Sequence, residues 1–176
     1  MTTNQIAECL IKDMSQRSFP IFLTTYQGQG MHEADAFGIN RNGYMYEYEI
    51  KRSRSDFKAE FRNKKDKHER LATRRAIKVY DEWKNGKRTG GTYELILIPN
   101  RYFFACPEGL IRPGELPDYA GLAWISADGD VKIQKDAKLL HRHKANERIY
   151  ERVAAILSQR MLYGCSYFTY QQKKEL

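Results

Sequence analysis

Residues 32–51 have the sequence HEADAFGINRNGYMYEYEIK, which predicts a β-hairpin. Small or apolar residues alternate with charged ones in both arms, and a period of two is typical of a strand with one buried face. Asn42 and Gly43 between the arms are a strong hairpin signal. A two-residue turn would mix charged and apolar side chains on each face. A three-residue turn over 41–43 keeps one face apolar and places Gly43 at the left-handed position that this turn needs. We therefore expect the three-residue turn, in which Ala36 faces Tyr48.

This register gathers acidic side chains on one face of the hairpin. Asp35 lies opposite Glu49, Glu33 lies opposite Lys51, and Glu47 shares the face of Glu49. Like charges opposite each other in a strand pair are destabilising, so the acids need compensation. Protonation of one acid, or Lys51 alone, could provide it. A divalent cation is the most direct solution, because Mg²⁺ or Mn²⁺ prefers carboxylate, carbonyl and water oxygens.

These residue types suit the chemistry of phosphodiesters. A bound cation polarises a phosphate oxygen and acidifies a water molecule, and Lys51 can orient that water or stabilise the developing charge. The triplet (Asp/Glu)-x-Lys is a weak signal alone, because it occurs five times in this chain. Only the copy at 49–51 ends a predicted strand that pairs with another acid-bearing strand. An amphipathic hairpin with a solvated polar face stays open as the alternative.

The rest of the chain predicts one mixed α/β domain. Apolar periodicity predicts a helix at 4–15 with a cap at Thr3 or Asn4, a helical segment from Ser55 to Trp83 with a break near 64–67, and a closing helix. Further strands are expected at 19–25, 93–98, 101–106, 121–126 and 131–134, with a loop at 85–91. We expect one domain over 1–176, with a core at about 3–135, a C-terminal helix at about 145–162 and a mixed β-sheet flanked by helices.

Positive charge is concentrated in one segment. The chain has 30 lysines and arginines against 22 acidic residues, a net charge of +8, and the segment 51–75 alone has a net charge of +7. A concentrated basic segment is the electrostatic footprint of a polyanion, most often nucleic acid. A solvated, salt-bridged helix face would give the same pattern.

The composition also predicts the compartment. No apolar run is long enough for a membrane helix, and Glu8, Lys12 and Asp13 stand where a signal peptide would need apolar residues. Three cysteines, at positions 9, 106 and 165, form no CxxC pair. We expect reduced thiols, no membrane association and a cytoplasmic location, in a bacterium or a phage-infected host.

The acidic hairpin also resembles a known signature. Asp35, followed after the turn by Glu49-Ile50-Lys51, resembles the motif of the PD-(D/E)xK nuclease superfamily. With the segments 48–57, 67–68, 101–107 and 119–122, it is similar to small phage-borne and bacterial nucleases, including the MmcB-like DNA-repair family. Ala34 stands where the motif has proline. The resemblance implies a restriction-endonuclease-like core and a Mg²⁺- or Mn²⁺-dependent endonuclease that hydrolyses DNA.

The resemblance assigns roles by position. Asp35, Glu49 and the Ile50 carbonyl would bind the metal, and Lys51 would be the catalytic lysine. Glu8 is a candidate for a further acid on the first helix, and Glu33 and Glu47 are additional acids without an assigned role. A homodimer is also expected by resemblance. The DNA-binding candidates are the basic residues that follow the hairpin: Arg52, Arg54, Lys58, Arg62, Lys64, Lys65, Lys67 and His68.

Three interpretations follow from the sequence. The first is a metal-dependent deoxyribonuclease of phage or DNA-repair context. The second is a protein that keeps the nuclease fold and recognises DNA or a DNA structure without cutting it. The third is a phage protein that binds a protein partner. His68 also has a simple structural reading, because it is in phase with Phe61 and Leu71 on one helix face.

Overall fold

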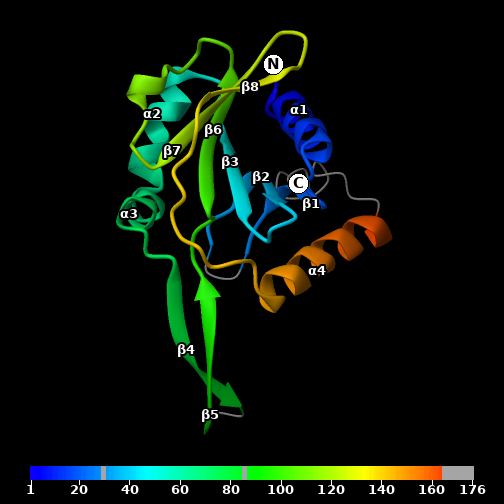
Figure 1. The fold of residues 1–176 in the computed structure, drawn as a ribbon, viewed down its shortest axis with the longest axis vertical. Helices are drawn as coiled ribbons and strands as arrows, with labels where there is room; N and C mark the ends of the chain where they lie inside the picture. The colour runs from blue at the N-terminus through cyan, green and yellow to red at the C-terminus, as the bar shows by residue number, and fades with distance from the viewer. Residues whose placement is uncertain (29–30, 85–86, 164–176) are drawn as a thin grey trace, which may run out of the picture.

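The central feature of the fold is a six-stranded mixed sheet, here described from a computed structural model that covers residues 1–28, 31–84 and 87–163 (Figure 1). The strand order is β1-β2-β3-β6-β7-β8. The β3–β6 and β6–β7 pairs are parallel, and the other pairs are antiparallel. The strands are β1 (Ile21–Tyr26), β2 (Ala34–Ile39), β3 (Met45–Ile50), β6 (Arg101–Pro107), β7 (Ala120–Ile125) and β8 (Val131–Lys135). The predicted α/β class, with a mixed sheet flanked by helices, is confirmed.

The hairpin of β2 and β3 has the predicted register. Ala36 pairs with Tyr48, and the ladder continues to Ile39 and Met45 at the turn. Gly43 has a φ of +81°, the left-handed conformation that the three-residue turn needs. The side chain of Asn40 closes the turn, because its Oδ1 accepts the N–H groups of residues 42 and 44. The apolar face thus fixes the register, and the turn chemistry agrees with it.

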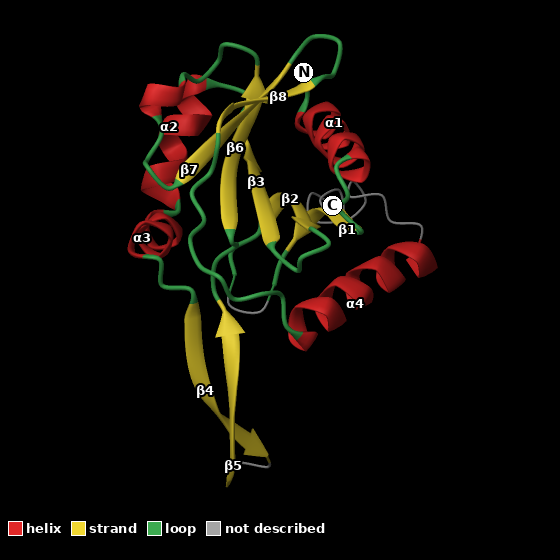
Figure 2. Ribbon diagram, in the orientation of Figure 1, coloured by secondary structure: helices red, strands yellow, loops and turns green. Residues whose placement is uncertain are grey.

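Helices cover both faces of this sheet (Figure 2). Helix α1 (Thr3–Gln16) packs on one face, and α2 (Arg54–Asn63) and α3 (Lys65–Thr73) pack on the other. Successive residues of β6 point to these two layers in turn, since Phe103 joins the α1 cluster and Phe104 the α2–α3 cluster. No helix within the described ranges is long and apolar enough to cross a membrane.

The ends of the chain's first and last helices differ slightly from the predictions. Thr2, rather than Thr3 or Asn4, caps α1, and it forms a capping box with Gln5. Helix α4 (Glu147–Tyr163) packs its apolar stripe, which includes Ile149 and Val153, into the same cluster as strands β1, β2 and β3. The C-terminal helix is therefore part of the core.

The predicted helical segment from Ser55 to Trp83 is wrong in its last third. It breaks at Lys64, as expected, but α3 ends at Thr73 because Arg74 adopts a left-handed conformation with a φ of 53°. Strand β4 (Ile77–Lys84) then begins, and it pairs with β5 (Lys87–Ile96) in a separate two-stranded sheet. The predicted loop at 85–91 is also wrong from residue 87 onward, while residues 85–86 lie outside the described part.

Candidate functional site

The site is built around Glu49, a carboxylate near the end of β3 that is only 3% exposed. Its Oε1 lies 3.0 Å from the Lys51 ammonium and 2.6 Å from that of Lys64, and its Oε2 lies 2.7 Å from Lys67. Burial alone would raise the pKa of Glu49, but these lysines, Lys67 foremost, lower it below the usual value. Glu49 is therefore held as an anion inside the protein.

Glu47 lies two residues earlier, on the same face of β3, and shares Lys67 with Glu49. Lys67 Nζ is 2.7 Å from Glu47 Oε1, and both side chains are almost fully buried. The Lys67 ammonium also lies 4.9 Å from the centre of the Tyr102 ring, in cation–π contact. Burial raises the pKa of Glu47, and Lys67 opposes that rise. Lys67 thus bridges two neighbouring carboxylates from α3.

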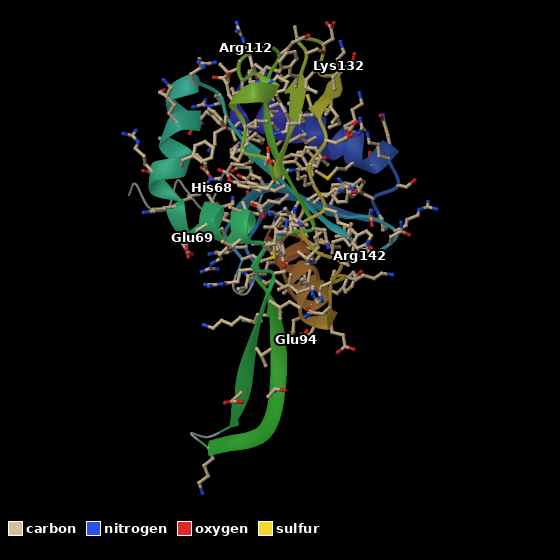
Figure 3. All side chains as sticks on the ribbon, turned by 60° about the vertical axis from the view of Figure 1, so that its left-hand side comes forward. His68, Glu69, Glu94, Arg112, Lys132 and Arg142 are labelled. Carbon is tan, nitrogen blue, oxygen red and sulfur yellow. The ribbon has the colours of Figure 1, made fainter. Side chains whose placement is uncertain are left out.

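Lys51 is held on its other side by helix α2. Its ammonium lies 2.8 Å from Glu60 Oε2, and Glu60 Oε1 lies 3.2 Å from His68 Nε2. His68 Nδ1 in turn lies 2.6 Å from the Tyr119 hydroxyl, so a chain of polar groups runs from Tyr119 to Glu49. Figure 3 shows His68 directed into the body of the protein, while its neighbour Glu69 is exposed.

Asp35 stands at the edge of this cluster and is the one member without a counter-ion. Its Oδ2 accepts the Ile50 N–H at 2.7 Å, which fastens β2 to the end of β3 beyond the regular ladder. Within the described residues Asp35 forms no ion pair. Desolvation, followed by repulsion from Glu49, raises the pKa of Asp35 from 3.8 to about 6. An ionised Asp35 is therefore energetically costly in the protein as it stands.

The charges of the cluster do not balance. Four buried or half-buried carboxylates (Asp35, Glu47, Glu49 and Glu60) face three ammonium groups (Lys51, Lys64 and Lys67). A fifth carboxylate, on the exposed Asp56, lies 3.6 Å from Lys51. Lys64 is the accessible member, with a side chain 35% exposed against 5% and 3% for the other two lysines. It also lowers the pKa of Asp35, so its ammonium acts on both Asp35 and Glu49.

The donor set partly suits a hard divalent cation. Asp35 and Glu49 offer carboxylate oxygens from adjacent strands, and the negative surplus favours a further cation. Both oxygens of Glu49 are paired with lysines, however, and the described residues contain no group of three or more His, Cys, Asp or Glu side chains placed to bind a metal. A cation that bound Glu49 Oε1 would therefore have to displace the Lys64 ammonium, which lies 2.6 Å from that oxygen.

Two of the three additional acids predicted for the site lie outside it. Glu33 is exposed before the start of β2, and its expected partner Lys51 is occupied by Glu49 and Glu60. The predicted Glu33–Lys51 pair is therefore wrong, because the β2–β3 ladder stops before reaching it. Glu8 is exposed on α1, on the opposite face of the sheet from Glu49. Only Glu47 joins the cluster.

The predicted DNA-binding residues are in part buried and in part exposed, and Lys64, at 35% exposure, is intermediate. Lys67 and His68 are buried and engaged with acidic partners, so we do not retain them as surface contacts; the simple structural reading of His68 is the better one. Arg54 is exposed but paired with Glu115. The exposed members on α2, α3 and the segment before them are Arg52, Arg54, Lys58, Arg62 and Lys65.

Sequence reasoning missed Glu60 and Tyr119. Glu60 follows Phe57 by one helical turn and lies on the inward face of α2, where an acid needs a partner. That signal was available in the sequence, because a lone acid in an apolar stripe indicates a buried ion pair. Tyr119 belongs to a segment that resembles the nuclease family, but no pattern in the sequence connects it with His68.

Comparisons with known proteins bear on the fold. No family model matches the chain, and no curated protein matches it. A solved structure described as the SPO1766 protein of unknown function from Silicibacter pomeroyi is similar, with a TM-score of 0.60 and 19% sequence identity. The match covers 96% of this chain and 98% of the other. At this identity, the likeness shows that the two chains share a fold over nearly their whole length.

Proposed function

We propose that the protein is a divalent-metal-dependent deoxyribonuclease whose active site comprises Asp35, Glu49 and Lys51. The observation that carries this proposal is the Asp35 carboxylate, held against the Ile50 N–H beside Glu49 without a counter-ion of its own. Carboxylates at the ends of two adjacent strands, followed by a lysine on the same face, form a site for one cation and one phosphate.

The residues of the cluster would have two roles, metal binding and stabilisation of charge on the phosphate. Asp35, Glu49 and the Ile50 carbonyl would hold Mg²⁺ or Mn²⁺, which when bound polarises the phosphate and acidifies water. Burial alone would lower the pKa of Lys51, but Glu49 and Glu60 raise it above its usual value. Lys51 therefore keeps its proton and acts as a fixed positive charge for the phosphate oxygens, not as a general base.

The surface beside the site suits a DNA backbone. Arg52, Lys58, Arg62 and Lys65 are exposed on the segment and helices that follow Lys51, so they can contact phosphates close to the cleaved bond. Cys9 and Cys106 are free thiols, which supports a location in a reducing cytosol. Together these features support the nuclease interpretation, in a bacterial or phage-infected cell.

The test is cleavage of plasmid and branched DNA with Mg²⁺, Mn²⁺ or EDTA. We expect cutting that requires the metal and is abolished in Lys51→Met and Asp35→Asn. Asp130-Val-Lys132 is the matched control, because it repeats the triplet on the exposed edge of β8. The double variant Asp130→Asn, Lys132→Met should cut at the wild-type rate. Wild-type rates in folded Lys51→Met and Asp35→Asn, verified by circular dichroism, would overturn the assignment.

One observation favours a second function, DNA binding without cleavage. Three lysines pair with Glu49, so this carboxylate has counter-ions without any metal. If the protein binds DNA but cuts none of the substrates with either metal, and shows no Mn²⁺ binding by calorimetry, this second function replaces the first.

A further inference from the structure

Lys64 differs from the other two lysines of the cluster in its position and its exposure. It is the residue between the end of α2 and the start of α3, with a φ of −119° and a ψ of 41°, so its backbone lies outside both helices. Its ammonium reaches inward, to 2.6 Å from Glu49 Oε1 and 3.4 Å from Glu60 Oε2. The side chain is nevertheless 35% exposed, so Lys64 extends from the surface to two buried carboxylates.

Lys64 can leave the cluster at a lower cost than the buried lysines. Both of its partners keep another cation without it, because Lys51 lies 3.0 Å from Glu49 Oε1 and 2.8 Å from Glu60 Oε2. Glu49 also keeps Lys67 on its other oxygen. The Lys64 ammonium would pass into water, whereas the side chains of Lys51 and Lys67 are only 5% and 3% exposed. Because the costly state is a buried charge without a partner, the release of Lys64 avoids that cost.

The charge of the cluster favours exchange of Lys64 for a metal over simple addition of the metal. With Asp35 ionised and His68 neutral, the four buried or half-buried carboxylates exceed the three ammonium groups by one charge, and the exposed Asp56 is solvated. A divalent cation added beside all three ammonium groups would leave one positive charge too many. A divalent cation that replaces the Lys64 ammonium brings the sum to zero, which is the more stable state where the dielectric constant is low.

We propose that Lys64 is a built-in counter-ion that holds Glu49 in the metal-free protein, exchanges with the divalent cation, and then binds the phosphate at the site. This inference rests on the proposed function and gives Lys64 a role inside the site as well as on its surface. The released ammonium stays tethered beside Glu49, so it remains near a phosphate that the cation holds. A lysine ammonium is a common point-charge partner of phosphate.

The surface onto which Lys64 would turn carries the charge that a phosphate requires. Arg62 and Lys65 lie on either side of it at the helix junction, and both are exposed. Asp66 is the acid of this junction, and it is paired with Arg70 at 2.7 Å. The released ammonium would therefore add a third cation to this part of the surface.

The first test compares two neighbouring amines in the wild-type protein. Limited acetylation by acetic anhydride, followed by mass spectrometry, measures how fast Lys64 and Lys65 react. In EDTA, Lys64 should react more slowly than the exposed Lys65, because its ammonium is held by Glu49 and Glu60. With saturating Mn²⁺ the Lys64 rate should rise at least roughly fivefold, while the Lys65 rate stays within about twofold. Potassium chloride at the same ionic strength should not produce this rise, because salt screens buried ion pairs only weakly.

The second test shows when Lys64 contacts DNA. Duplex binding is measured by fluorescence anisotropy over a range of salt concentrations, with a phosphorothioate duplex that resists cutting. In EDTA, Lys64→Met should leave the log–log salt dependence near that of the wild type, because Lys64 is then held by Glu49. In Mn²⁺ the same variant should make it shallower by about 0.9 relative to the wild type, the loss of one neutralised phosphate. Lys65→Met is the matched control, and its effect should be the same with and without metal.

The outcomes separate this inference from the proposed function. If Mn²⁺ binds in calorimetry and DNA is cut, but Lys64 stays as unreactive as in EDTA, the exchange is overturned and the nuclease stands. A wild-type salt dependence for Lys64→Met in Mn²⁺ overturns the phosphate contact. If neither the wild type nor Lys64→Met binds Mn²⁺, the metal-dependent function and the exchange are both overturned. The acetylation test uses the wild type, so it decides even where Lys64→Met does not fold.

Discussion

Replacing Asp35 by asparagine should stabilise the metal-free protein above about pH 6. The carboxylate has a pKa raised from 3.8 to about 6 by burial and by Glu49. Its ionisation is thus harder in the folded state than in the unfolded one, and folding stability falls as the pH rises from about 4 to 6. Asparagine does not ionise, and its amide oxygen can still accept the Ile50 N–H that Asp35 Oδ2 accepts.

The size of the effect follows from the pKa. Raising it from 3.8 to about 6 corresponds to about 3 kcal/mol, at about 1.4 kcal/mol for each pH unit. Asp35 is half-buried and keeps some contact with solvent, which reduces the penalty. We therefore expect Asp35→Asn to gain about 1–3 kcal/mol relative to wild type between pH 4 and pH 8, with most of the change below about pH 6.

Urea unfolding in EDTA, measured from about pH 4 to pH 8, tests this expectation. The difference between variant and wild type should grow through the lower half of this range and then level off. Glu8→Gln, an exposed acid on the opposite face of the sheet, is the control and should change stability little. A variant that is less stable than wild type at pH 8, or a difference that is constant with pH, would refute the reasoning about Asp35.

Metal addition should stabilise the wild type and leave Asp35→Asn unchanged. A cation that binds only the folded state stabilises it by about 2.7 kcal/mol at a concentration of about 100 times its dissociation constant. With Mn²⁺ the wild type should gain thermal stability, and Asp35→Asn should not, because it has lost a carboxylate ligand. An equal gain in both proteins would mean that Mn²⁺ binds elsewhere.

Three further substitutions probe the ion-pair network. Lys67→Met should destabilise the fold by about 3–5 kcal/mol, because it leaves the buried Glu47 without its lysine and takes from Glu49 the lysine on Oε2. Lys65→Met on the exposed side of α3 should cost less than about 0.5 kcal/mol in the same urea titration. Glu60→Gln should lower the melting temperature, since Lys51 and His68 both lose a charged partner. An unchanged melting temperature would show that the pairs of Glu60 with Lys51 and His68 do not stabilise the fold. Lys64→Met should tighten Mn²⁺ binding several-fold in calorimetry, because it leaves Glu49 Oε1 with one ammonium partner, Lys51, in place of two. Weaker binding would show that Lys64 does not compete with the cation.

The sequence predicted the hairpin because two independent signals agreed. Apolar alternation required one register, and Gly43 in the turn selected the same one. The prediction from the sequence failed at β4, because the apolar residues there have helical spacing although they lie in an extended segment: Ala76, Val79, Tyr80 and Trp83. What ends α3 is the left-handed Arg74, a conformation that residues other than glycine adopt only rarely. No pattern in the sequence could have indicated it.

The sequence predicted which acidic residues form the site better than it predicted which lysines pair with them. Asp35, Glu49 and Lys51 were identified by strand periodicity, and the structure brings them together. The number of lysines that turn inward was not predictable, because helix α3 carries Lys65 and Lys67 in the same basic run and only the packing decides which is buried. A charge count along the chain measures the total charge and does not separate solvated from neutralised side chains.

The cost of the network is itself an argument about function. Moving charged groups from water into a protein interior costs several kcal/mol for each ion, and well-packed apolar residues of similar size are often at least as stabilising. A core of apolar side chains was available here, since Phe57, Phe61 and Phe104 pack on the same face of the sheet as Glu49. A sequence selected for stability alone would have extended that core. The surplus of negative charge that leaves Asp35 unbalanced supports the proposed cation site, because the charge that the cluster lacks is positive.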